Sequence, residues 1–143
     1  MADYYAQRAS AGLILSEAVN ISPAAIGSLS TPGLYTAAQI AAWRQVTAAV
    51  HQAGGLIFTQ LWHTGHVGHS SDRGGALPLA PSAIKIEGMQ HFTAQRMQDY
   101  EIPQAMTAAD TEATVADYAQ AAINALAAGF GGVQLHAANG YLP

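Results

Sequence analysis

GGVQLHAANGYLP, residues 131–143, decides the fold of this chain, because a short apolar run passes directly into a cluster of polar side chains. The run GGVQL has the length and composition of a buried β-strand. His136, Asn139 and Tyr141 follow it, and all three can take part in hydrogen-bond or proton chemistry. Polar groups placed directly after a strand are typical of parallel α/β folds, whose sites lie at the carboxyl ends of the strands.

Two earlier apolar runs have the same character. Residues 12–18 (GLILSEA) carry Ser16 and Glu17 near their end, and residues 55–62 (GLIFTQLW) carry Gln60. All three runs are short, nearly continuous in apolar residues and bounded by glycine, as parallel strands buried on both faces are. We therefore predict three β-strands, over residues 12–18, 55–62 and 131–135.

Two amphipathic helices separate these strands. Thr36 is a suitable N-cap for the first helix, and Gly54 ends it. The second helix is predicted over residues 112–128, with Gly129 as its stop. The predicted apolar stripes consist of Ile40, Trp43, Val46 and Val50 in the first helix and of Val115, Tyr118, Ala122, Ile123 and Leu126 in the second.

The order of these elements indicates two βαβ units, which imply parallel strands covered by helices. Residues 63–110 show no strong periodicity, and so long a loop after the second strand usually serves as a lid or a binding segment. An open doubly wound sheet usually has a glycine-rich phosphate turn after its first strand, but VNISPAA follows here. A (β/α)8 barrel places polar side chains at several strand ends and takes about 250 residues. We therefore predict an α/β fold, an incomplete (β/α)8 TIM barrel segment over residues 1–143.

The composition limits the classes of function. Half of the residues are hydrophobic (50%) and only 10% are charged, so we expect several faces to be buried against a partner or further sequence. The net charge of −4 argues against a nucleic-acid partner. No apolar run approaches the roughly 20 residues that cross a membrane, and the N-terminus has no apolar signal core. A cytoplasmic protein without a membrane partner is therefore expected, and the absence of cysteine excludes disulfides and thiolate metal sites.

Three histidines follow the second strand as H-x-x-H-x-x-H. They are His63, His66 and His69, with Asp72 close by. Imidazole is a common metal ligand, so a zinc site has to be considered. Residues at i, i+3 and i+6 do not stay on one face of a helix, and the intervening glycines disfavour a helix. We therefore predict no metal site, and interpret these residues as polar loop residues or contacts to anionic groups.

The polar residues at the strand ends have two interpretations each. A buried Gln60 needs partners, because an unpaired amide costs about 1–3 kcal/mol; its donors and acceptor suit the edge of a flat heterocycle or a core hydrogen bond to a neighbouring strand. Trp62 either lines a pocket or packs in the core. His136 and Asn139 can direct two donors at one carbonyl oxygen, with Tyr141 as a proton donor. The alternative is that they complete a turn at the Asn-Gly dipeptide.

The chain resembles the old yellow enzyme family of FMN-dependent ene-reductases in four stretches, which follow the family order and cover nearly the whole chain. The stretches are YYAQRASAGLILSEA, TPGLYTAAQIAAWRQVTAAVHQAGGLIFTQLWHTGH, ALPLAPSAI and AGFGGVQLHAANGYL. QLWHTG, APSAI and HAANGYL together are specific to this family. The resemblance implies a (β/α)8 barrel that holds FMN at its carboxyl face, with NADH or NADPH as the reductant.

The resemblance also implies roles for the residues after the third predicted strand. The reduced flavin of the family passes hydride from its N5 to the β-carbon of an activated alkene. His136 and Asn139 match the pair that binds the electron-withdrawing oxygen of this substrate. Tyr141 matches the residue that delivers a proton to the α-carbon.

Three residues of the first two predicted strands match positions near the flavin in the family. Gln60 matches the glutamine that hydrogen-bonds the pyrimidine edge of FMN. Ala18 matches the small residue where the backbone approaches the flavin. Trp62 matches a pocket residue near the flavin and the substrate. His66 stands where many members have arginine, which puts any anion contact there in question.

The resemblance covers only strands two to four of the family barrel. The family has a further strand before this region, and a later half that includes a flavin-binding arginine and phosphate-holding loops. We therefore expect an isolated chain that is weakly stable, oligomeric or aggregation-prone and that has lost most FMN affinity. The chain is interpreted as a segment of an ene-reductase that works with the remainder of its barrel. The alternative is a non-catalytic barrel fragment that associates with copies of itself.

Overall fold

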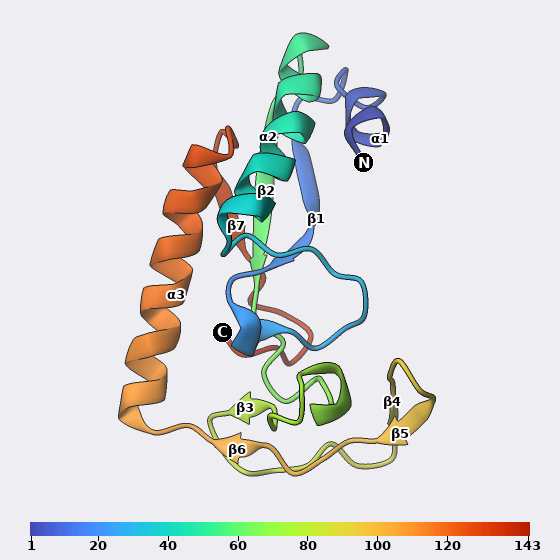
Figure 1. Cartoon of the computed structure of the whole chain (residues 1–143), viewed down its shortest axis with the longest axis vertical. Coiled ribbons are helices and arrows are strands. Elements are labelled where there is room, and N and C mark those ends of the chain that lie inside the picture. Colours follow the sequence, from blue (N-terminus) through green and yellow to red (C-terminus); the bar gives the residue numbers. More distant parts are fainter.

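A parallel sheet forms the centre of the molecule. The computed structural model describes residues 1–143. The three strands of the sheet lie in the order β1-β2-β7, and neighbouring strands run parallel. Their bounds are β1 (Ile14–Asn20), β2 (Ile57–Trp62) and β7 (Val133–Leu135). Figure 1 shows that α2 (Ala37–Gln52) connects the first two strands and that α3 (Ala108–Ala127) leads into the third, so the predicted βαβ order is confirmed.

Both long helices begin at a threonine that caps them. The Thr36 side chain accepts a hydrogen bond from the Gln39 backbone, and the Gln39 side chain accepts one from the Thr36 backbone, which completes a capping box. Thr107 and Asp110 form the same arrangement at the start of α3. This capping box starts α3 at Ala108. The predicted start at residue 112 is therefore wrong by four residues, because the Thr107–Asp110 pattern was not taken as a helix start.

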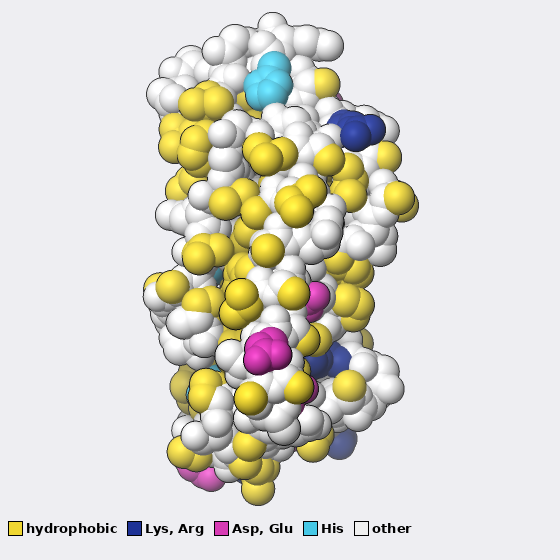
Figure 2. All heavy atoms as spheres, turned by 90° about the vertical axis from the view of Figure 1, so that its left-hand side faces the viewer, with side chains coloured by type: hydrophobic (Ala, Val, Ile, Leu, Met, Phe, Trp, Pro, Cys, Tyr) yellow, Lys and Arg dark blue, Asp and Glu magenta, His cyan; other side chains and the backbone are white.

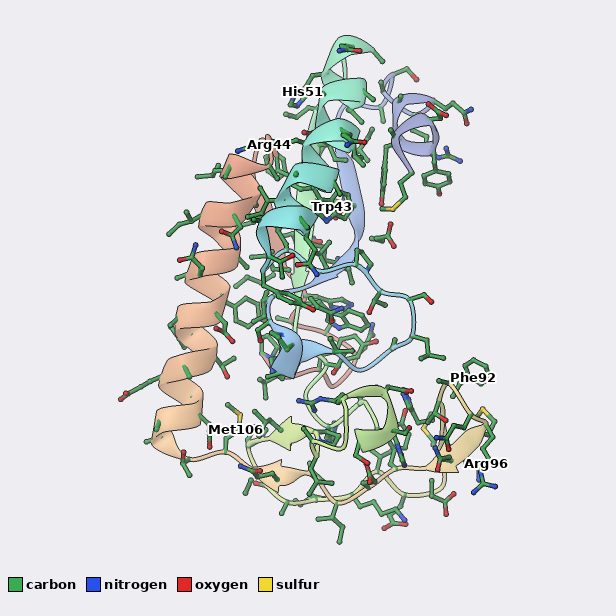
Figure 3. All side chains as sticks on the ribbon, viewed as in Figure 1. Trp43, Arg44, His51, Phe92, Arg96 and Met106 are labelled. Carbon is green, nitrogen blue, oxygen red and sulfur yellow. The ribbon has the colours of Figure 1, made fainter.

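The buried core lies between the helices and one face of the sheet. Ile57 and Leu61 on β2 are completely buried, and Trp43 on α2 packs against them in the same core. Figure 3 shows Trp43 between α2 and the strands, where its Nε1–H donates to the Gly33 carbonyl at 3.2 Å. Its ring centroid lies 5.2 Å from that of Phe130. The helix-covered face of the sheet is therefore fixed by apolar packing together with a satisfied indole.

The predicted apolar stripe of α3 is partly wrong. The helix meets the core through the small residues Ala121 and Ala125, both 0% exposed, because alanine lets the helix approach closely. Tyr118 and Ala122 are half-buried against the core, as predicted. The other three stripe residues are exposed: Val115 by 63%, Ile123 by 59% and Leu126 by 67%. Figure 2 shows the face that carries α3, where hydrophobic side chains extend over most of the height and charged side chains are few.

Residues 63–107 contain more structure than the predicted irregular loop. They form two small sheets, a parallel pair of β3 with β6 and an antiparallel hairpin of β4 with β5. The bounds are β3 (Leu79–Ala80), β4 (Gln90–Phe92), β5 (Met97–Asp99) and β6 (Gln104–Ala105). Phe92 and Arg96 lie in the hairpin that projects from this end of the molecule (Figure 3). These strands are too short for a periodicity to show in the sequence.

A short helix that the sequence analysis did not predict, α1 (Ala2–Ala6), precedes the first strand. Its Tyr5 is buried, and the Tyr5 ring centroid lies 6.3 Å from that of Trp43 on α2. None of the helices combines the length and apolarity that a bilayer span requires.

Candidate functional site

Gln60 occupies the middle of a row of three residues that crosses the sheet. The strand register pairs Gln60 with Ala18 on β1 and with Gln134 on β7. The Gln60 side-chain Nε2 donates a hydrogen bond to Gln134 Oε1 at 2.7 Å. Ile57 and Leu61 point into the helix-covered core, so the intervening Gln60 lies on the opposite, open face of the sheet.

A β-bulge in β1 sets the register of this row. The pairing with β2 shifts between Leu15 and Ala18, which brings Ala18 opposite Gln60. A bulge leaves backbone groups without a partner in the ladder, and two hydroxyls replace the missing acceptors here. The Glu17 N–H donates to the Tyr5 hydroxyl at 2.9 Å, and the Gln60 N–H donates to Ser16 Oγ at 3.2 Å.

The Tyr5 hydroxyl also donates to Glu17 Oε1 at 3.2 Å, so it both accepts from and donates to the same residue. Burial raises the pKa of Tyr5 to about 12, and the nearby Glu17 carboxylate acts in the same direction. The hydroxyl is therefore protonated at neutral pH and can keep both hydrogen bonds.

Three predicted site residues form an aromatic cluster at the carboxyl end of the sheet. The Trp62 and His136 rings stack with centroids 6.3 Å apart and an interplanar angle of 22°. Tyr141 meets both rings edge-on, with its centroid 5.0 Å from that of Trp62 and 4.8 Å from that of His136. Trp62 is buried, whereas His136 and Tyr141 are half-buried. The structure therefore brings these three residues together, as parallel strands that end at one edge should.

Backbone hydrogen bonds tie the segment after β7 to the end of β2. The His136 N–H donates to the Leu61 carbonyl at 2.9 Å, and the Leu142 N–H donates to the His63 carbonyl at 3.1 Å. Gly65 adopts a φ of +62°, and a Cβ built there would lie 3.1 Å from the Leu142 nitrogen. A larger side chain at Gly65 would therefore push this segment away from the ring cluster.

Asn139 is the predicted site residue that the structure does not bring into the ring cluster. It is exposed, its φ is +59°, and Gly140 after it has a φ of +73°. Its side chain makes no hydrogen bond to the rest of the chain, which leaves both its donors and its acceptor free for a ligand. Gly140 is near the imidazole of His66, since a Cβ built on Gly140 would lie 4.0 Å from His66 Nε2.

The three histidines of the H-x-x-H-x-x-H pattern lie in different surroundings. His63 is 1% exposed, and its Nδ1 accepts a hydrogen bond from the Gly65 N–H at 3.1 Å. Burial lowers the pKa of His63 to about 4, and the positive charge of Arg73 adds to this effect. His69 instead lies 3.8 Å from a Glu101 carboxylate oxygen. No group of three or more histidine, cysteine, aspartate or glutamate side chains is arranged to hold a metal ion.

A largely apolar hollow of about 560 Å³ lies elsewhere, beside the amino-terminal half of α3. Tyr118, Leu135 and Leu142 are among the residues that line it. Leu135 is paired with Leu61 and so lies on the side of the sheet opposite to Gln60 and Gln134. This hollow is therefore separate from the row around Gln60.

The residues that could hold a cofactor are those of the Ala18–Gln60–Gln134 row. After its bond to Gln134, the Gln60 amide keeps one N–H and its carbonyl oxygen free. The neighbouring Ala18 has only a methyl group, which leaves space beside this amide. A flat heterocycle that presents adjacent donors and acceptors along one edge fits this row.

Three residues of the site were not predicted from the sequence as part of it. Gln134 lies between Val133 and Leu135 in an apolar run, which is the same signal that singled out Gln60. Ser16 and Tyr5 support the bulge, and no sequence pattern shows that a helix residue will pair with a strand amide.

Comparisons with known proteins agree with this architecture. The family model of NADH:flavin oxidoreductases / NADH oxidases matches residues 1–143. A flavin oxidoreductase from Emericella nidulans is 48% identical over 141 residues, which cover 98% of this chain and 36% of the relative. The 12-oxophytodienoate reductase 1 of Oryza sativa subsp. japonica is 41% identical over 145 residues, with 97% and 36% covered. The chain therefore spans little more than a third of the length of these curated relatives.

Solved structures show the same partial coverage. The old yellow enzyme homologue from Zymomonas mobilis superposes with a TM-score of 0.93 at 49% identity, over 99% of this chain and 39% of that one. Morphinone reductase in complex with tetrahydroNAD superposes with a TM-score of 0.91 at 47% identity, over 98% and 40%. The three-stranded sheet thus corresponds to part of a (β/α)8 barrel, and the predicted fold class is confirmed. From the sheet, its strand-end residues and these matches together, we conclude that the chain belongs to the old yellow enzyme family of FMN-dependent oxidoreductases.

Proposed function

We propose that residues 1–143 are an incomplete barrel segment of an ene-reductase that reduces activated C=C bonds with NADH or NADPH, and that the segment is not competent alone. The first strand and the later half of the barrel would lie in a longer chain or in a complementing one. Two observations support this division: the match covers 36% of the first curated relative, and the open face of the sheet carries the polar residues.

In this proposal the row around Gln60 holds the pyrimidine edge of FMN. The free N–H and carbonyl oxygen of Gln60 bind the ring edge, while the methyl group of Ala18 lets the ring approach the backbone. Bound FMN supplies the hydride chemistry. The half-buried position of Gln60 beside so small a residue supports this role, because a larger neighbour would fill the space.

The residues after β7 bind and protonate the substrate in this proposal. His136 and Asn139 donate hydrogen bonds to the carbonyl or nitro oxygen of the alkene, and so stabilise the negative charge that develops there. Tyr141 delivers a proton to the α-carbon, and Trp62 forms a wall of the pocket. The single observation that carries the proposal is the contact of Trp62, His136 and Tyr141 at the end of β2, the strand that also carries Gln60.

Reassembly tests this function. The chain would be combined with a polypeptide that carries the remaining strands of a family barrel, and reduction of 2-cyclohexenone by NADH or NADPH would be measured. We expect His136→Ala and Asn139→Ala each to lower kcat/KM about 100-fold, the typical loss of one oxyanion donor. Tyr141→Phe removes the proposed proton donor and should also lower kcat/KM. Tyr4→Phe is its matched control, because Tyr4 is 56% exposed and far along the chain from the site. Equal activities of the site variants and the control would contradict the proposal.

The second candidate function is self-association of a non-catalytic fragment. All three residues of β7 are exposed and its outer edge is unpaired, while Val115, Ile123 and Leu126 expose apolar surface on α3. Gel filtration with and without FMN separates the two candidates. The first predicts flavin binding only with the remaining barrel polypeptide, whereas the second predicts an oligomer that is unaffected by flavin.

We propose NADH or NADPH as the reductant, since morphinone reductase was solved with tetrahydroNAD and a 42% identical relative is an NADP-dependent oxidoreductase. A cytoplasmic location is proposed from the sequence alone.

A further inference from the structure

Gln134 faces Gln60 across the strand pair and is hydrogen-bonded to it. Both lie at one level of the parallel ladder, and Gln60 Nε2 is 2.7 Å from Gln134 Oε1. The distance is at the short end of the range for an N–H···O hydrogen bond. Gln134 lies on an exposed strand, and its side chain makes no other hydrogen bond within the chain.

The geometry of a carboxamide makes this contact directional. The oxygen and nitrogen of an amide lie on opposite sides of one planar group, so a Gln60 nitrogen turned toward β7 turns the Gln60 oxygen toward β1. The neighbour on that side is Ala18, which has no side-chain donor to occupy the oxygen. The backbone of Gln60 is held as well, because its N–H donates to Ser16 Oγ. Gln60 is thus fixed by β1 through its backbone and by β7 through its side chain.

We propose that Gln134 is a positioning residue, which holds the Gln60 amide so that its oxygen and remaining N–H face the edge of a flat ligand ring. The inference rests on the proposed function, because that ring is the pyrimidine edge of a flavin. Without the contact, a glutamine on an open face samples several rotamers, and binding a ligand would require ordering them again.

The chemistry of the side chain at position 134 determines which way the Gln60 amide turns. A carboxylate only accepts, so Gln134→Glu keeps the Gln60 nitrogen toward β7 and its oxygen toward the ligand. An ammonium only donates, so Gln134→Lys reverses the amide and presents N–H groups to the ligand. Gln134→Met has a similar shape without a hydrogen bond and leaves the amide free. If the contact only joined the two strands, the Glu and Lys variants would have the same effect on ligand binding.

The first measurement needs no ligand. The side-chain NH₂ resonances of Gln60 are followed by ¹⁵N–¹H NMR in the wild-type chain and the three variants, each ¹⁵N-labelled and reassembled with a polypeptide that carries the remaining barrel strands. We expect Gln134→Glu to leave the chemical shifts of these protons near those of the wild type, and Gln134→Met to move them toward those of a free glutamine. Leu135→Met is the control, since Leu135 points to the other side of the sheet and should leave them unchanged. Unchanged Gln60 resonances in Gln134→Met would overturn the inference.

The second measurement asks whether this orientation serves a flavin. The chain, reassembled with a polypeptide that carries the remaining barrel strands, is titrated with FMN and with 3-methyl-FMN, whose N3 has no hydrogen to donate, and the Gln60 resonances report binding. A change of charge at position 134 alters the affinities for both ligands by a similar factor. The ratio of the two affinities therefore reports the contact at N3. We expect FMN to bind about three- to tenfold better than 3-methyl-FMN in wild type and Gln134→Glu, as one hydrogen bond gives. The ratio should fall to about one in the Met and Lys variants.

The failures of the two ideas are distinguishable. If FMN does not shift the Gln60 resonances of the reassembled wild type even at millimolar concentration, the proposed flavin site is wrong, and the positioning role toward a ring fails with it. If the wild-type chain prefers FMN over 3-methyl-FMN and all three variants keep the same preference, the flavin site stands and the role of Gln134 is overturned.

Discussion

The two faces of β2 differ in what they contact, although their residues alternate along one strand. Ile57, Thr59 and Leu61 are 0% exposed and lie against the helices, whereas Phe58 and Gln60 are half-buried on the open face. The first face contributes to the stability of the segment. The second carries the polar row and leads to the ring cluster. Substitutions on the helix-covered face should therefore change the free energy of unfolding, whereas substitutions on the open face should change ligand binding.

The largest effect should come from the helix-covered face. Leu61→Ala removes a completely buried side chain and leaves a cavity, so we expect the free energy of unfolding to fall by about 2–5 kcal/mol. The neighbouring Gln60→Ala removes one side-chain hydrogen bond on the open face and should cost about 1 kcal/mol or less. Urea denaturation of both variants measures the difference. Similar losses in the two variants would show that the faces are not distinct.

The pH dependence of stability tests whether His63, the buried residue directly after β2, is neutral in the folded chain. Burial lowers the folded-state pKa of His63 from its ordinary value of 6.5 to about 4, so the unfolded state binds the proton more readily. The wild type should therefore lose stability as the pH falls from 6.5 to 4, by up to about 3 kcal/mol from this residue, and nothing from it above pH 6.5. His63→Asn does not titrate and serves as the control in denaturation series at each pH. Parallel pH curves for the two proteins would contradict a buried neutral His63.

A smaller effect is expected at the bulge that joins the two faces. Tyr5→Phe removes the hydroxyl that accepts from the Glu17 N–H, so we expect a loss of about 1–2 kcal/mol. Faster hydrogen exchange of the Glu17 amide should accompany this loss. Tyr4→Phe is the control, because Tyr4 is 56% exposed and takes no part in the bulge. If the Glu17 amide exchanged equally in both variants, the Tyr5 hydroxyl would not be what holds the bulge.

The smallest effect concerns α3, which covers only the buried face. Thr107→Ala removes the N-cap hydroxyl, which accepts a hydrogen bond from the Asp110 N–H. We expect the free energy of unfolding to fall by about 1 kcal/mol. Thr36→Ala at the equivalent capping box of α2 should cost about as much. Thermal or urea denaturation measures both, with Glu112→Gln as an exposed control in the second turn of α3. A cap variant indistinguishable from this control would mean that α3 does not depend on its capping box.

The sequence predicted those features whose signal lies within a few neighbouring residues. The strands over residues 55–62 and 131–135, the Thr36 cap and the glycine stop at Gly129 were found, because apolar runs and caps are local patterns. The first strand was shifted by two residues, since it extends to Asn20 beyond the predicted Ala18. The turn that the Asn-Gly dipeptide favours is also present at Asn139 and Gly140.

Features that depend on contacts between distant segments were missed. The apolar stripe of α3 was predicted from hydrophobicity alone, but the tight packing of this helix selected Ala121 and Ala125 for burial and left Leu126 exposed. The Ser16 and Tyr5 hydroxyls act on a bulge that exists only once β1 has paired with β2. The Gln60–Gln134 hydrogen bond likewise requires the register of β2 and β7, which no single stretch of sequence shows.

The most direct test of the account measures FMN retained after gel filtration, by the chain alone and by the chain reassembled with a polypeptide that carries the remaining barrel strands. We predict no retained flavin for the chain alone, stoichiometric flavin for the reassembled wild type, and a clear loss for reassembled Gln60→Leu with the overall fold intact. Leu135→Met should retain the wild-type amount. Flavin that is absent from the reassembled wild type, or retained equally by Gln60→Leu, would contradict the claim that the open face of this sheet is a flavin site.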